Sequence, residues 1–82
     1  MPYNADIIEE LEILSLFDLS STQAGIKIHK TAMQTEVHAA KRLHKKGLIT
    51  QSDGGYLTNL GLEAAEHAES LCRILQAEKS AS

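Results

Sequence analysis

The sequence predicts a mainly helical protein with one small β-hairpin. Apolar residues recur at helical spacing in three segments, and a capping signal indicates a further short helix. The period becomes strand-like near residues 48–58. The chain has 82 residues, which is the length of a single domain, and we expect one domain over residues 1–82. Because only three residues are aromatic, its core must be built mostly from aliphatic side chains.

The first helix is expected over residues 5–17. Asn4 is suited to accept a hydrogen bond at the start of this helix, and Asp6 suits the positive end of the helix dipole. Apolar residues then recur at helical spacing as far as Phe17. The polar run that begins at Asp18 ends the helix.

A second and a third helix are expected over residues 22–30 and 34–46, joined by a tight turn. Ser20 and Gln23 have the spacing of a capping box at the start of the second helix. The third helix is expected to end at Gly47, a typical residue for a helix C-terminus.

Residues 48–58 predict a hairpin, because Asp53, Gly54 and Gly55 lie between two strand-like runs and supply the backbone freedom that tight turns need. A final helix is then expected over residues 60–78, capped by Thr58 or Asn59. Its apolar residues spread unusually widely around the helix axis.

This order of elements, three helices followed by a hairpin and a closing helix, is that of a winged helix-turn-helix domain. Residues 40–65, AKRLHKKGLITQSDGGYLTNLGLEAA, resemble the recognition helix end, wing and following helix of small bacterial regulators of the MarR, PadR and ArsR kind. The whole chain also resembles a small proteobacterial family of single-domain proteins of about this length. The resemblance implies the winged-helix fold more specifically than it implies a function.

The distribution of charge favours a DNA-binding surface. The net charge of −3 excludes a protein that coats nucleic acid through overall positive charge. However, residues 27–46 hold six basic residues and one acid, a formal charge of +5, while the rest of the chain carries −8. Three-quarters of the cations therefore lie in the predicted helix-turn-helix.

The predicted third helix carries an arc of polar and basic residues opposite its apolar side, as helices that enter the major groove do. The residues that we expect to bind duplex DNA are Gln34, Thr35, His38, Lys41, Arg42, Lys45 and Lys46. Gln34 suits adenine and Arg42 suits guanine, while the cations mainly suit phosphates. The alternative for Lys45 and Lys46 is that they only stabilise the negative end of the helix dipole.

Two features oppose DNA binding and keep a second hypothesis open. The predicted wing, residues 50–56, has no lysine or arginine and includes Asp53. Thr31 stands at a turn position that is often glycine, and Lys30 stands where an apolar residue is common. The second hypothesis is a protein-protein interaction module on the same scaffold that does not bind DNA.

The last helix is expected to form a homodimer interface. Its apolar surface is too wide for one seam against a small core, so we expect Leu71, Ile74 and Leu75 to contact a second copy. The alternative is that the first helix covers this surface within one monomer.

No enzyme, cofactor or metal site is expected. No catalytic grouping is recognisable, and the histidines lack regular metal-ligand spacing. We expect His44, on the apolar side of its helix, to be a core or capping residue rather than a ligand. The single cysteine, Cys72, is expected to be buried. With one cysteine and no apolar run long enough for a membrane span, a cytoplasmic location is expected.

Overall fold

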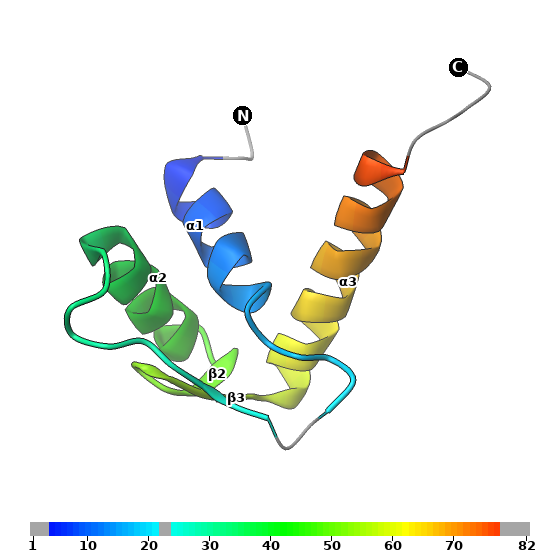
Figure 1. Ribbon diagram of the computed structural model, residues 1–82. Coiled ribbons are helices and arrows are strands. Elements are labelled where there is room, and N and C mark those ends of the chain that lie inside the picture. The colour runs from blue at the N-terminus through cyan, green and yellow to red at the C-terminus, as the bar shows by residue number, and fades with distance from the viewer. Residues whose placement is uncertain (1–3, 22–23, 78–82) are drawn as a thin grey trace.

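The computed structural model describes residues 4–21 and 24–77. Its elements are α1 (Ala5–Leu14), β1 (Ile26–Lys27), α2 (Gln34–Lys45), β2 (Ile49–Gln51), β3 (Gly54–Leu57) and α3 (Asn59–Gln76). The strands form one antiparallel sheet in the order β1-β3-β2. The helices stand on one side of this sheet, and α1 lies between α2 and α3 (Figure 1). The predicted mainly helical class with a small β component is confirmed.

The predicted helix starts are confirmed by their caps. The Asn4 side chain accepts a hydrogen bond from the Ile7 N–H at 2.9 Å and begins α1. The Thr58 hydroxyl accepts one from the Gly61 N–H at 3.0 Å and begins α3. Gly47 follows α2 with a φ of 82°, so the predicted glycine stop is confirmed as well.

Three predicted helix ends differ from the structure, the smallest difference being that α2 ends at Lys45 rather than at residue 46. The helix expected over residues 5–17 ends at Leu14, because the Leu16 and Phe17 N–H groups bond three residues back in a tighter turn. Phe17 is nevertheless buried. Its apolar side chain fits the helical spacing of the sequence, although its backbone lies beyond the helix. The last helix ends at Gln76, and the expected end at residue 78 lies outside the described residues.

The helix predicted over residues 22–30 is wrong in the part that the structure describes. Residues 22–23, which include Gln23 of the expected capping box, lie outside that part. Ile26 and Lys27 form β1, which pairs with the two glycines of β3. The partly buried Ile26 and Ile28 flank the exposed Lys27, which is the alternating pattern of a strand rather than of a helix.

Sheet pairing explains why this segment is extended. Beyond the strand itself, the Ile28 N–H donates to the Asp53 carbonyl at 2.6 Å, so backbone groups bond across to the hairpin instead of locally. At Gly25 an added Cβ would lie 2.6 Å from the Gly55 carbonyl oxygen. Residues 24–33 therefore hold no first helix of a helix-turn-helix, and α2 follows an extended segment and a turn.

The predicted hairpin is confirmed as β2 and β3. Gly54 and Gly55 have the predicted positive φ values, 128° and 74°. They begin β3, however, and the turn itself consists of residues 52–53. A bulge interrupts the register between Ile49 and Gln51, and the Thr50 hydroxyl accepts from the Tyr56 N–H at 2.9 Å.

The core lies where α1 and α2 meet above the sheet. Its buried hydrophobic residues are Ile13, Leu14, Phe17, Ala39, Ala40, Leu43, Ile49 and Ala65. Ala39 and Ala40 are fully buried, and their small side chains let α2 pack closely on its neighbours. α3 contributes only Ala65 to this set, so it is the helix least embedded in the core.

The Gly25→Ala variant tests the extended conformation of the segment before α2. We expect it to lower the free energy of unfolding by about 1–3 kcal/mol, because the added methyl group collides with the β3 backbone. In a helix the same change would instead stabilise the protein by about 1 kcal/mol. Urea unfolding followed by circular dichroism gives the sign, and an increase in stability would contradict the strand pairing.

Candidate nucleic-acid interface

The structure divides the seven predicted DNA contacts into two groups. Four of them lie three or four residues apart along one face of α2 and are exposed: Gln34, His38, Lys41 and Lys45. The other three, Thr35, Arg42 and Lys46, lie on the side of α2 that faces α1.

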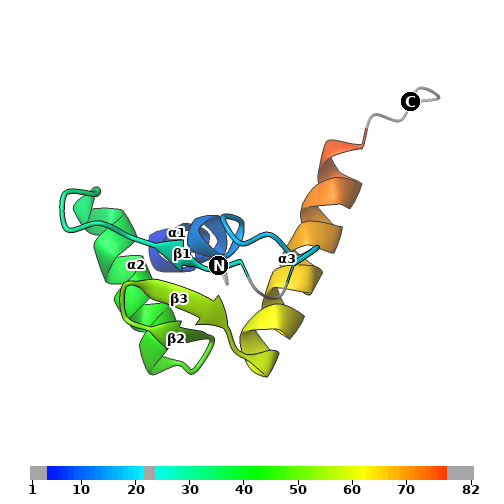
Figure 2. The ribbon, with the colours of Figure 1, turned by 60° about the horizontal axis from the view of Figure 1, so that its bottom comes forward.

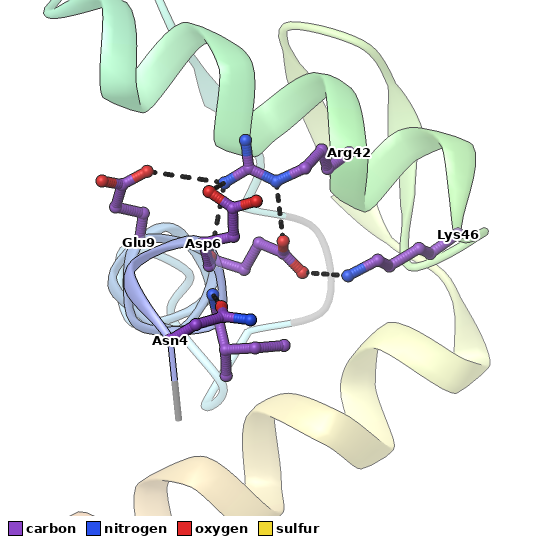
Figure 3. A network of polar contacts seen from close by, with 7 residues as sticks. Asn4, Asp6, Glu9, Arg42 and Lys46 are labelled. Carbon is purple, nitrogen blue, oxygen red and sulfur yellow. Dashed lines mark hydrogen bonds and ion pairs between the residues drawn. The ribbon is translucent and has the colours of Figure 1, made fainter. Parts of the chain in front are cut away.

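Arg42 and Lys46 both bind the carboxylate of Glu10 on α1 (Figure 3). The Arg42 Nε donates to Glu10 Oε2 at 2.8 Å, and Lys46 Nζ donates to the other carboxylate oxygen. Arg42 Nη2 also lies 3.5 Å from the Glu9 carboxylate and donates to the Asp6 carbonyl at 3.3 Å. Arg42 of α2 and Lys46, the residue that caps its C-terminus, thus clamp the first helix.

Glu10 is a charged side chain that the core tolerates because of this clamp. It is only 6% exposed, and burial by itself raises the pKa of its carboxyl group. The hydrogen bonds and charges of Lys46 and Arg42 outweigh burial, so the pKa of Glu10 lies below its ordinary value of 4.5. The Glu10 hydrogen bond in turn raises the pKa of Arg42. The carboxylate stays ionised at neutral pH and holds α1 against α2.

Arg42 and Lys46 therefore have a structural role, which the sequence alone did not indicate. Helical spacing places Arg42 within the polar arc and Lys41 at its border, but it does not show that acids of another helix lie opposite Arg42. Thr35 is separated from the exposed face too, since it lines a hollow between α1 and α2 beside Glu9 and Glu12. Only four of the seven predicted contacts share one open surface.

Two further expectations about side-chain burial are wrong. His44 is exposed, because α2 packs through Ala39, Ala40 and Leu43 and turns His44 away from that contact. Cys72 is exposed as well, because the C-terminal half of α3 extends beyond the core.

The exposed face of α2 continues onto the segment that precedes it. Lys27 and Lys30 line one groove together with Lys41 and the β2–β3 turn, residues 51–53. Lys45 follows Lys41 by one helical turn. We call Lys27, Lys30, Lys41 and Lys45 the lysine face. The two lysines before α2 were not among the predicted contacts, although the excess charge of residues 27–46 includes them.

In the part of the chain that the structure describes, no acid forms an ion pair with a residue of the lysine face. Among the described residues, the cations in ion pairs are Arg42, Lys46 and Arg73, and none of the four lysines is paired. Asp53 is the one carboxylate among the residues that line the groove. The face therefore offers ammonium groups to an anionic ligand without having to break existing contacts.

The predicted dimer residues lie in the C-terminal part of α3, on the side of the molecule away from α2 (Figure 1). Leu71, Ile74 and Leu75 are 46%, 70% and 73% exposed. α1 lies beside an earlier part of α3, near Ala65 and Ala68, so it does not cover these three side chains. The alternative in which α1 covers this surface within one monomer is wrong for them.

The site and fold define a small helical protein with a three-stranded antiparallel sheet and a basic face on its second helix. The chain belongs to DUF5669, a family of unknown function, which it matches over residues 1–76. No curated protein and no solved structure matches the chain. Within the described ranges, no helix is long and apolar enough to cross a membrane. The same ranges contain no group of three histidine, cysteine or acidic side chains that could hold a metal ion.

The Glu10→Gln variant tests the clamp between α1 and α2. We expect a loss of about 1–2 kcal/mol in the free energy of unfolding at neutral pH, because Arg42 and Lys46 lose their shared anion but remain partly solvated. Glu12→Gln is the matched control and should change stability little, because the Glu12 side chain is exposed and forms no ion pair with the described residues.

The effect of pH on these variants has a definite sign. Because the pKa of Glu10 is lower in the folded protein, its contribution is present above pH 4.5 and is lost as the pH falls through the folded value. The difference between wild type and Glu10→Gln should therefore shrink below pH 4.5. Urea titrations across this range measure it, and a difference independent of pH would contradict the clamp.

Proposed function

We propose that this protein binds duplex DNA through the lysine face, with no enzymatic activity. The observation that carries the proposal is the separation of cations by role: three described cations are paired within the chain, and four unpaired lysines gather on one face. Side chains kept free of internal partners on one surface are what phosphate binding requires.

The arrangement of α2 supports insertion into a groove. Its 12 residues make a rod about 18 Å long, which fits within the major groove. α2 lies at one edge of the molecule, with α1 on its inner side (Figure 2). Gln34 and His38 lie in its N-terminal half, where side chains of inserted helices reach base edges, and Lys41 and Lys45 follow toward the flanking phosphates.

The hairpin is a poor candidate for a DNA-contacting wing. The turn between β2 and β3 carries Asp53 and no cation, so it repels phosphates at one end of the groove. We infer a reduced winged-helix arrangement in which the hairpin follows α2 and supports it, while Lys27 and Lys30 supply the second set of phosphate contacts. Such a protein would work in the cytoplasm as a regulator of transcription.

The size of the lysine face limits the expected affinity. If all four lysines neutralise phosphates, the logarithm of the binding constant should fall with the logarithm of salt concentration with a slope of about −3.6. That slope is typical of weak contact by a small domain, and binding should be clear at low salt and faint at physiological salt.

The double variant Lys41→Ala/Lys45→Ala tests the proposal. We expect at least a tenfold loss of affinity for a mixed-sequence duplex at low salt, and a salt slope reduced to about −1.8, because two phosphate contacts are removed. Fluorescence anisotropy over a salt series measures both quantities. Arg73→Ala is a control for the change in charge, because Arg73 is paired with Glu69 on α3 and should not contact the duplex.

Two results would contradict DNA binding through the lysine face. One is an absence of binding by the wild type even at low salt. The other is equal affinity of the double variant and the wild type. If the wild type bound polyglutamate as tightly as it bound the duplex, the lysine face would be better explained as a docking site for an acidic protein.

A further inference from the structure

The C-terminal half of α3 carries an apolar seam that leaves the core. Positions Gly61, Ala64, Ala68, Leu71 and Leu75 follow one another at alternating spacings of three and four residues, the seam of a coiled coil. Along this seam Gly61 is buried, the two alanines are half-buried, and the two leucines are exposed. Every described residue after Ala68 is exposed. The seam thus continues from a packed region into solvent without interruption.

A hollow lies beside this seam, where α1 and α3 diverge. It is lined by Leu11, Leu14, Ser15, Phe17, Leu19, Ala65, Ala68, Glu69 and Cys72. The two helices form a V that opens toward the start of α1 and the end of α3 (Figure 1). Ile8 and Leu11 on α1 are exposed large apolar residues near this opening. The same face of the molecule therefore presents both an apolar ridge and an apolar hollow.

We propose that a second copy of this chain covers this face. The C-terminal turns of α3 in each copy would lie in the opening between α1 and α3 of the other copy. A ridge and a hollow on one face make that face self-complementary, as a two-fold interface requires. On α3, Glu63, Glu66 and Arg73 point away from the seam. Glu69 lines the hollow but is already paired with Arg73, so among the described residues α3 has no unpaired charge on this face for a charged partner.

The exposed area is sufficient for a modest dimer. The five large aliphatic residues of this face are Ile8, Leu11, Leu71, Ile74 and Leu75, with exposures between 37% and 73%. With roughly 100 Å² removable from each fully exposed side chain, they supply on the order of 300 Å² of apolar area per copy. Since somewhat over half of an interface is apolar, this corresponds to roughly 1,000 Å² in total, the lower end of specific interfaces.

Helix stability gives an independent reason for a partner. Every described residue beyond Ala68 is exposed, and of these Glu69 and Cys72 line the hollow beside α1. Within this part of the helix the one ion pair described joins Glu69 and Arg73. Helical segments of this length are marginal in water without a packed face. A second copy that covers Leu71 and Leu75 would supply that face.

The dimer leaves the lysine face open. α2 and α3 lie on opposite sides of α1, so the proposed interface and the proposed DNA surface do not overlap (Figure 1). The dimer can therefore be tested without DNA, and failure of either proposal would not decide the other.

Sedimentation equilibrium of the full chain tests the dimer. We expect the mass to rise from 9.0 kDa toward twice that value as the protein concentration increases through the micromolar range, because the interface is small. Leu75→Glu should remain monomeric, since it places a carboxylate in the seam. Ser70→Glu adds the same group on another face of α3 and should dimerise like the wild type.

The thiol of Cys72 gives a second readout that does not depend on any variant folding. Because Cys72 lines the hollow between α1 and α3, the second copy should shield it. Its rate of reaction with a disulfide reagent should therefore fall as the wild-type concentration rises. A mass of 9.0 kDa and an unchanged thiol rate at all concentrations would overturn the proposal and leave the face to a different partner.

Discussion

The contact on which the structure depends is the clamp of Glu10 by Arg42 and Lys46. A carboxylate buried in the contact between two helices is costly unless its charge is matched, and here Arg42 of α2 and the adjoining Lys46 match it. The clamp fixes the rotation of α2 relative to α1, because Arg42 and Lys46 must face inward. That rotation sends Lys41 and Lys45 outward. One buried charge thus decides which cations of α2 are structural and which are free for a ligand.

This packing decides which face of each helix is buried and which is exposed. α1 is the central helix, bound to α2 by charge and by small buried residues, and to α3 by apolar contacts near Ala65. α2 and α3, which lie on either side of α1, each have one face that is exposed to solvent. On α2 this face is basic, and on α3 it is apolar, which suits an anionic ligand and a second copy respectively. A two-fold dimer would present two basic faces to one duplex, so its affinity for DNA would be higher than that of a single copy.

Much of the fold could be predicted from local signals, because caps and turns depend on neighbouring residues. Asn4, Thr58, Gly47 and the paired glycines of the hairpin have the roles that the sequence indicated. The segment before α2 could not be predicted in this way. Its strand exists only because β3 offers backbone partners far along the chain, and two isoleucines separated by one lysine are too short a pattern to compete with a capping signal. The same limit applies to the site: Arg42 and Lys45 look alike in sequence, and only the acids on α1 distinguish them.

The separation of free and clamped cations is the central claim, and an NMR titration of the labelled protein with a short duplex tests it most directly. Signals of Lys27, Lys30, Lys41 and Lys45 should shift as duplex is added, while the Arg42 guanidinium signal should keep its position, because it remains bound to Glu10. A shift of the Arg42 signal equal to those of the lysine face would contradict the account. It would mean that DNA competes with α1 for that side chain and that the clamp does not separate the two sets.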